Sequence, residues 1–113
     1  MLTIDALREM GVQPEEGLNR CLNNEDFYLT LVKTIPADAG FQKLQEALEG
    51  NDLDAAFEAA HALKGVLGNL SLTPIYEPVY EITELLRSRT KMDYSPLLGT
   101  ILEQRDNLGK LCE

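Results

Sequence analysis

The stretch that most restricts the fold of this chain is residues 51–72, whose apolar side chains recur with the period of an α-helix. Each residue of an α-helix turns the chain by about 100°, so residues three or four apart share a face. The apolar residues that share one face here are Leu53, Ala56, Ala60, Leu63, Leu67 and Leu70. This stripe predicts a helix that begins after Asp52 as its N-cap and packs against other helices.

The opposite face of this predicted helix carries the only histidine of the chain, His61. The residues nearest to it on a helical wheel, all within about 80°, are Phe57, Lys64, Gly65, Gly68 and Asn69. A lone exposed histidine is usually just a solvated side chain. This set of neighbours instead favours a functional site, because Lys64 lies one turn away and brings a cation close to the ring.

Gly65 and Gly68 are unusual inside a helix, where each glycine costs about 1 kcal/mol relative to alanine. Glycine often serves close packing between helices, but that explanation requires the residue to face another helix. The wheel places both glycines on the outer face. The sequence therefore predicts a bare surface that lets another protein approach the imidazole of His61.

The segment His61-Ala62-Leu63-Lys64-Gly65, followed by Asn69-Leu70, resembles the H-x-L-K-G signature of histidine phosphotransfer (HPt) domains. The resemblance extends over nearly the whole chain, because the helix count and spacing also fit. One departure concerns the two positions after Gly65, which are often serine or alanine in the family and are Val66 and Leu67 here. Val66 lies about 140° from His61 on the wheel, so it should not block the site.

The resemblance implies a role for each residue around His61. HPt domains accept a phosphoryl group from the aspartyl-phosphate of one response-regulator receiver domain and pass it to another. By this resemblance His61 is phosphorylated and Lys64 stabilises the phosphoryl group, while Phe57, Gly65, Gly68 and Asn69 form the docking surface. A hybrid histidine kinase is a further expected partner. Mg²⁺ is expected on the receiver, with no cofactor or metal bound by this chain.

Some family members orient the imidazole with a polar residue on the following helix. The matching positions here are Thr83 and Glu84, and the sequence leaves the choice between them open. No Walker loop and no kinase glycine loop occur, so we expect a phosphocarrier and not an enzyme that draws phosphate from ATP. A general-base enzyme is disfavoured, since no nucleophile with an orienting acid is evident. The alternative left open is a helical interaction module that binds receiver or kinase domains without being phosphorylated.

The formal net charge of −9 argues against nucleic acid or an anionic membrane as a partner. Cys21 and Cys112 are too few for a disulfide framework or a zinc site. The N-terminus lacks the features of a signal peptide, and no stretch reaches the ~18 apolar residues of a membrane span. We therefore expect a cytoplasmic protein, free-standing and monomeric.

The remaining chain shows further amphipathic helices and no strand alternation. A first helix is expected at 4–10 with Thr3 as its cap, and a short second helix should follow Pro14. The long core helices expected are 24–49 (one kinked helix or two), 52–70, 73–90 and 95–111, the last capped by Ser95. Short turns between them favour antiparallel neighbours. The prediction is an all-α, antiparallel up-and-down four-helix bundle with short N-terminal capping helices.

The predicted chain is a single domain, residues 1–113, with residues 1–23 as the N-terminal cap and residues 24–111 as the bundle. Inward-facing side chains are expected in every helix. They include Leu22 in the cap, Phe27, Leu31 and Ile35 on one face of the first core helix, and Ile75, Val79, Ile82 and Leu86 on the third. Three tyrosines, Tyr76, Tyr80 and Tyr94, are expected at the edge of the core.

Overall fold

The computed structural model describes all 113 residues, and every regular element in it is helical. The elements are α1 (Ile4–Met10), α2 (Glu15–Arg20), α3 (Glu25–Lys33), the 3₁₀ turn η1 (Ile35–Ala37), α4 (Ala39–Glu49), α5 (Leu53–Asn69), α6 (Thr73–Arg87) and α7 (Ser95–Leu111). The all-α prediction is therefore confirmed. None of these helices combines the length and the apolar character needed to cross a membrane.

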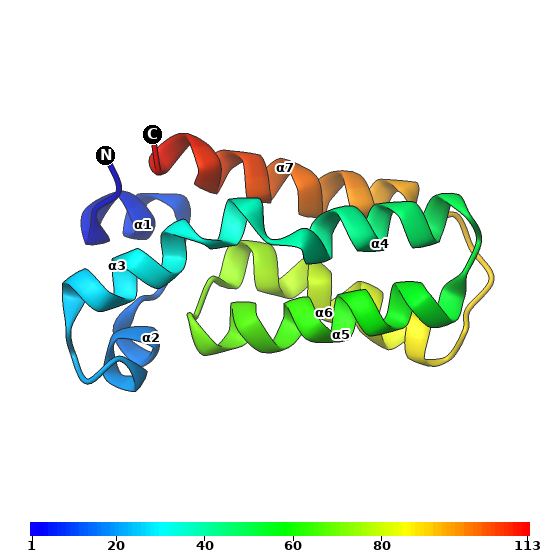
Figure 1. Ribbon diagram of the computed structural model, residues 1–113, viewed down its shortest axis with the longest axis horizontal. Helices are drawn as coiled ribbons and strands as arrows, with labels where there is room; N and C mark the ends of the chain where they lie inside the picture. Colours follow the sequence, from blue (N-terminus) through cyan, green and yellow to red (C-terminus); the bar gives the residue numbers. More distant parts are fainter.

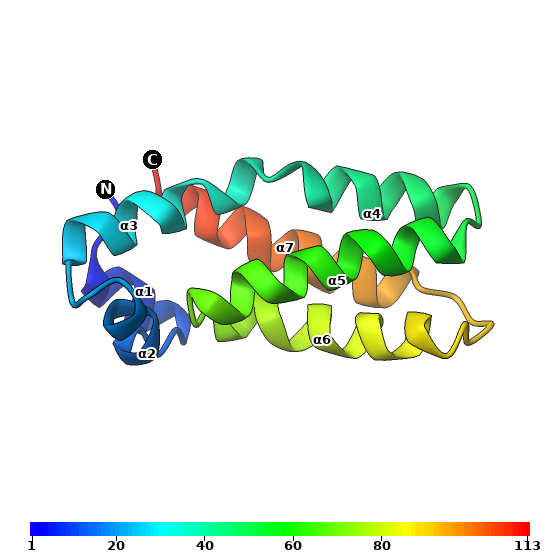
Figure 2. The same cartoon turned by 60° about the horizontal axis from the view of Figure 1, so that its bottom comes forward.

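Four helices, α4, α5, α6 and α7, run alongside one another and alternate in direction (Figures 1 and 2). Helix α5 packs against α4 on one side and α6 on the other, and α7 packs against α6 and η1. The result is an elongated molecule with extents of 41 × 24 × 20 Å. The predicted up-and-down bundle is confirmed.

The remaining helices, α1, α2 and α3, gather at one end of the bundle (Figure 1). Helix α1 contacts α7, and α2 contacts α3. The two chain ends also meet at this end, where the ammonium group of Met1 donates a hydrogen bond to the carbonyl oxygen of Glu113. These short helices therefore cover the end of the bundle at which α5 finishes and α6 begins.

Four of the helices begin directly after a residue whose side chain caps the first turn. Thr3, Asn24, Asp38 and Asp52 each accept a hydrogen bond from a backbone N–H in the first turn of α1, α3, α4 and α5, respectively. Such bonds satisfy N–H groups that have no partner inside the helix. The caps expected at Thr3 and Asp52 are thus present.

The segment 24–49 forms two α-helices rather than one. Helix α3 ends at Lys33, and the turn η1 contains Pro36, which has no N–H and disfavours helical geometry at the preceding residue. Asp38 then starts α4 by accepting a hydrogen bond from the N–H of Gly40 at 2.7 Å. The interruption lets the chain bend between the capping helices and the bundle.

Two expected core residues face solvent instead. The side chain of Phe27 is 51% exposed, whereas Tyr28 and Val32 are fully buried. Burying Tyr28 turns Phe27 outward, because neighbouring helical residues point about 100° apart. Leu22 is 89% exposed and adopts a φ of 58° in the turn after α2. The inward placement of Leu22 and Phe27 was wrong.

Two helix ends also differ from the prediction. Helix α6 stops at Arg87, three residues before the predicted end, and Arg89 takes a φ of 52° in the turn that follows. Ser95 lies within α7 and does not cap it. The carboxylate of Asp93 instead accepts a hydrogen bond from the N–H of Ser95 at 2.9 Å, and its bonds with Ser95 lower the pKa of Asp93.

Tyr28 is the largest fully buried side chain, and its hydroxyl donates a hydrogen bond to the carbonyl oxygen of Leu70 at 2.7 Å. Burial, aided by the charges of Cys21 and Glu15, raises the pKa of Tyr28 to about 12. Since an unfolded tyrosine titrates near pH 10, the folded state holds this proton longer than the unfolded state. Stability should therefore be retained below about pH 10 and lost as pH rises through about 12.

Replacement of Tyr28 by Phe is expected to remove this alkaline loss of stability, at a cost of about 1–3 kcal/mol near neutral pH from the unpaired Leu70 carbonyl. Urea unfolding of both proteins across the alkaline range measures the effect. An equally steep alkaline loss in the variant would show that another group is responsible. Ultraviolet titration of the variant should also show one tyrosine fewer ionising near pH 12 than the unaltered protein does.

Candidate functional site

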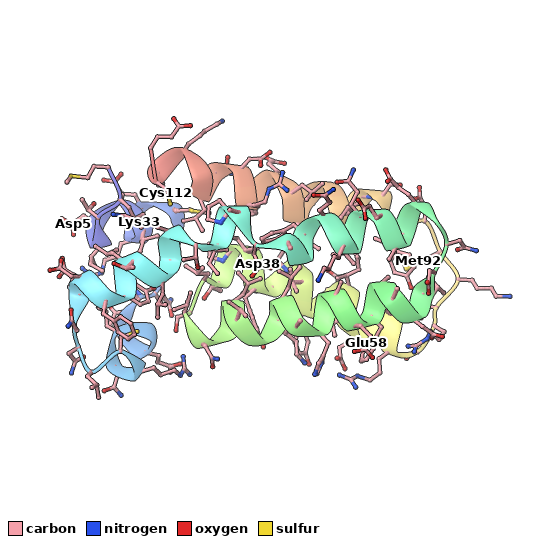
Figure 3. The ribbon with its side chains drawn as sticks, in the orientation of Figure 1. Asp5, Lys33, Asp38, Glu58, Met92 and Cys112 are labelled. Carbon is pink, nitrogen blue, oxygen red and sulfur yellow. The ribbon has the colours of Figure 1, made fainter.

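Helix α5 presents one side to the core and the other to solvent. Its residues Ala56, Ala60, Leu63 and Leu67 are at most 2% exposed and pack within the bundle. His61 lies on the outward side and is exposed, as the helical wheel predicts. Glu58, three residues earlier, points away from the bundle (Figure 3). The helical period alone thus accounts for the exposure of the imidazole.

The imidazole of His61 stacks on the ring of Phe57, one turn earlier on α5. The ring centroids lie 5.6 Å apart, and the ring planes differ by 26°. Neither ring nitrogen of His61 has a hydrogen-bond partner within the chain. Both nitrogens are therefore accessible, and a neutral imidazole carries a lone pair that can act as a nucleophile.

The two glycines near His61 differ in their surroundings. A Cβ atom built on Gly65 would have no neighbour within 4 Å, so the space beside this residue is open. A Cβ atom on Gly68 would lie 3.1 Å from the Cε1 atom of Tyr76 on α6. The outward placement is confirmed for Gly65, whereas Gly68 also lets α5 and α6 pack closely through Tyr76.

Lys64 lies one turn after His61 and is half-buried. Its ammonium nitrogen lies 5.4 Å above the centre of the Tyr80 ring, a cation–π contact between α5 and α6. Tyr80 in turn lies 6.0 Å from Tyr76, measured between ring centroids. Tyr80 is 47% exposed, so its expected place at the core edge was wrong. Tyr76 is half-buried and packs against the core as expected, whereas Tyr94 belongs to the buried core itself.

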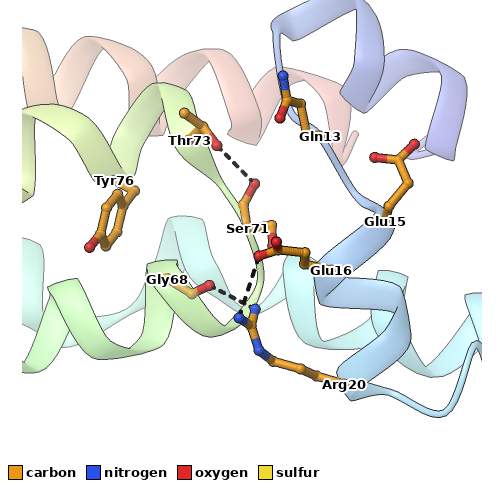
Figure 4. A pocket seen from close by; sticks show the side chains of 8 residues that line it. All are labelled: Gln13, Glu15, Glu16, Arg20, Gly68, Ser71, Thr73 and Tyr76. Atoms are coloured by element: carbon orange, nitrogen blue, oxygen red, sulfur yellow. Dashed lines mark hydrogen bonds and ion pairs between the residues drawn. The ribbon is translucent and has the colours of Figure 1, made fainter.

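Asn69 is the last residue of α5, and its side chain is exposed. The guanidinium of Arg20 on α2 donates a hydrogen bond to the carbonyl oxygen of Gly68 at 3.1 Å (Figure 4). It donates another to the carbonyl oxygen of Asn69, also at 3.1 Å. Arg20 also pairs with Glu16 at 3.6 Å. Because the carbonyl end of a helix carries partial negative charge, Arg20 stabilises the end of α5 and joins it to the capping helices.

Arg20, Gly68 and Tyr76 also line a cavity of about 590 Å³ between α2 and the turn from α5 to α6 (Figure 4). Glu15 and Glu16 line the same cavity from α2, the helix that also carries Arg20. The ion pair with Arg8 lowers the pKa of Glu15. The cavity is therefore lined by charges of both signs. Asn69 lies near it, because its carbonyl oxygen accepts a hydrogen bond from Arg20.

The two candidates for orienting the imidazole from α6 behave differently. Thr83 is fully buried, and its hydroxyl donates a hydrogen bond to the carbonyl oxygen of Val79 at 2.6 Å. Thr83 therefore cannot reach an exposed ring, and that candidate was wrong. Glu84 is half-buried and pairs with Arg87 at 3.3 Å, with no hydrogen bond to His61.

Two arginines near the C-terminal end of α6, where basic residues interact favourably with the helix dipole, also contact the predicted docking residue Phe57. The guanidinium carbons of Arg87 and Arg89 lie 5.0 Å and 5.2 Å from the centre of the Phe57 ring. Phe57 thus contacts two cations and the imidazole. No sequence spacing could have revealed this contact, because it depends on how α6 lies against α5.

No cluster of three or more His, Cys, Asp or Glu side chains is placed to hold a metal ion. The chemistry available to the site is that of an accessible imidazole beside Lys64, with the open space at Gly65. Such a site can accept a small electrophilic group delivered by a partner protein. That no cofactor is needed stays a prediction.

Comparison with known proteins identifies the family to which this chain belongs. The model of the Hpt domain family matches residues 32–111, which include α4, α5, α6 and α7. No curated protein and no solved structure gave a match. Hpt domains are phosphotransfer modules of two-component systems, act as phosphocarriers, and interact with response-regulator receiver domains and kinases. The match covers well over half of the chain, and the chain therefore belongs to the Hpt domain family.

Proposed function

We propose that His61 accepts a phosphoryl group from the aspartyl-phosphate of one receiver domain and passes it to a second receiver in a phosphorelay. The observation that carries this proposal is the exposed imidazole with two unpaired nitrogens next to the open space at Gly65. A phosphoryl donor can approach such a ring without displacing a hydrogen bond of the chain.

The proposed transfer is an in-line displacement at phosphorus. A lone pair on one imidazole nitrogen forms the N–P bond, and the P–O bond to the aspartate carboxylate of the receiver breaks. The electron pair of that bond stays on the carboxylate oxygen, and the proton of the other ring nitrogen is released to water. The reverse sequence hands the group to the second receiver.

Charge on the transferring phosphoryl group needs nearby cations. Lys64 is proposed to supply one from α5, since its ammonium group is held over Tyr80 one turn after His61. The receiver is proposed to supply the Mg²⁺ and the phosphorylated aspartate. A solvated lysine paired with a neighbouring acid is the ordinary role of such a residue, but no ion pair of Lys64 occurs here.

The proposed docking surface for the receiver consists of Phe57, Gly65, Gly68 and Asn69. The open space at Gly65 supports this proposal most directly. We further propose that all 113 residues act as one module, with residues 1–23 as its cap and residues 24–111 as its bundle. The module is proposed to act in the cytoplasm as a monomer.

The test is a transfer assay with the purified chain, Mg²⁺ and a receiver domain phosphorylated in advance with labelled phosphate. The expected result is label on the chain that is lost in acid and stable in base, as a phosphorylated imidazole should be. A second, unphosphorylated receiver should then take the label from the isolated phosphoprotein. If several receivers bind the chain but transfer nothing, the protein is instead an interaction module that works without phosphorylation.

Gly65 and Gly99 offer a matched pair for testing the docking surface. Both lie inside helices, and a Cβ atom on either one would meet nothing within 4 Å. Gly65→Ala and Gly99→Ala are each expected to raise the free energy of unfolding by about 1 kcal/mol, because alanine is the better helix former. Only Gly65→Ala is expected to weaken receiver binding, by about tenfold if the added methyl costs the interface ~1.4 kcal/mol.

Urea unfolding and titration with a receiver domain measure the two effects separately. Equal affinities for Gly65→Ala, Gly99→Ala and the unaltered chain would remove Gly65 from the docking surface. An affinity loss in the Gly99 variant would mean that the receiver also contacts α7.

A further inference from the structure

We propose that Phe57 is a positioning residue that holds the imidazole of His61 in the orientation needed for transfer, and that Arg87 and Arg89 hold Phe57. This inference rests on the proposed phosphorylation of His61 and deepens it. The observations behind it are the stacked rings on α5 and the two guanidinium groups that the end of α6 brings to the same phenyl ring.

An exposed histidine on a helix surface ordinarily turns about its side-chain bonds, since only packing or hydrogen bonds select one rotamer. His61 has no hydrogen bond to restrict it. Its contact with Phe57, at 5.6 Å between centroids and 26° between planes, is a stacked arrangement that aromatic rings favour. This contact supplies the restriction that a hydrogen bond would otherwise provide.

The ring of Phe57 is itself restrained from α6. Arg87 is paired with Glu84 at 3.3 Å, and Arg89 is paired at 2.7 Å with Asp54 in the first turn of α5. Arg89 also donates a hydrogen bond to the carbonyl oxygen of Leu86 at 2.6 Å. Both guanidinium groups over the phenyl ring are therefore anchored, so the position of Phe57 depends on the packing of α5 against α6.

Positioning through a stacked face has a chemical consequence. The stack contacts the π-face of the imidazole and leaves both nitrogens free, one to bond phosphorus and one to release its proton. A hydrogen bond from α6 would occupy one of them. Thr83 is unable to make such a bond, because its hydroxyl is buried and bonded to Val79.

Phe57 also belongs to the proposed docking surface, and two variants separate its positioning role from its contact with the receiver. Phe57→Leu keeps an apolar side chain but removes the stacked ring, whereas Phe57→Tyr keeps the ring. We expect Phe57→Leu to lower the rate constant of transfer at saturating phosphorylated receiver by about 10–100-fold, since small misalignments of reacting groups cost that much. Because leucine keeps an apolar side chain in the proposed docking surface, receiver affinity should change far less than the rate, and Phe57→Tyr should restore the rate.

Phe27→Leu provides the matched control, because Phe27 is also a half-exposed phenylalanine on a helix but lies on α3 and does not stack on His61. It should transfer at the rate of the unaltered chain. Arg89→Gln should lower the transfer rate in the same direction as Phe57→Leu, since it removes one of the two cations that hold the phenyl ring.

A second measurement does not depend on phosphorylation. Three-bond NMR couplings of the His61 side chain in the unphosphorylated protein should show one dominant χ1 rotamer, and rotamer averaging in Phe57→Leu. Loss of receiver affinity with an unchanged saturating rate and an unchanged rotamer would overturn the positioning role and make Phe57 a docking residue only. If the unaltered chain accepts no phosphate, the proposed function fails, while the couplings still decide whether Phe57 orients the ring.

Discussion

His61→Gln is expected to abolish acid-labile phosphorylation of this protein completely. The chain has a single histidine, and the glutamine amide has no lone pair comparable to that of a neutral imidazole nitrogen. The loss should be total and not graded, because the proposed reaction forms its new bond to that nitrogen. The measurement is transfer of label from a phosphorylated receiver to the purified variant.

The same substitution should leave the fold and the docking surface intact. His61 is exposed and makes no hydrogen bond, so its replacement removes only the stacking contact with Phe57. The free energy of unfolding should change by no more than about 1 kcal/mol. Receiver affinity should be retained, which makes loss of transfer attributable to chemistry. Label that persists on the variant would place the phosphoryl group on another residue and end the proposal for His61.

Gly17→Ala is expected to destabilise the protein more than any other single methyl addition at a glycine. A Cβ atom at this buried position on α2 would lie 2.6 Å from Cε1 of Tyr28 and 2.8 Å from the carbonyl oxygen of Leu70. The second neighbour is backbone, which cannot move aside as a side-chain tip can. The carbonyl oxygen of Leu70 also accepts a hydrogen bond from the hydroxyl of Tyr28, so moving this carbonyl aside would stretch that bond.

Overpacking of this kind typically lowers the free energy of unfolding by about 1–3 kcal/mol. Because the clash here is with backbone, we expect Gly17→Ala to lie at the upper end of that range, at about 3 kcal/mol. The helix propensity of alanine offsets about 1 kcal/mol, which leaves a net loss of about 2 kcal/mol. Urea unfolding measures it, with Gly99→Ala as the control that gains stability. A variant as stable as the unaltered protein would mean that α2 shifts freely against the end of α5.

Much of this molecule follows from short-range sequence patterns. The apolar stripe of α5 determines that His61 faces solvent, since the two faces of a helix are set by its period alone. Caps at Thr3, Asp38 and Asp52 start their helices because each side chain bonds a backbone N–H two or three residues away. Membership of the HPt domain family, which the residues around His61 indicated, was confirmed by the family match.

Errors arose where two neighbouring residues competed for the core. Phe27 and Tyr28 are both large and apolar, and helical period does not say which of them is buried. Tyr28 is buried because its hydroxyl reaches the carbonyl oxygen of Leu70, 42 residues away in sequence. That partner becomes available only after α3 and the end of α5 have come together.

Local patterns in the sequence account for the helical fold, for the outward face of α5 and for the residues that surround His61 on that helix. The contacts that α6 makes with these residues arise only in the folded bundle. They are Tyr76 against Gly68, Tyr80 under Lys64, and Arg87 and Arg89 around Phe57. The two kinds of contact differ in their range along the sequence. A helical period relates residues within one helix, whereas contacts between helices depend on how far each is rotated and shifted against its neighbour, which the packing of the whole core decides.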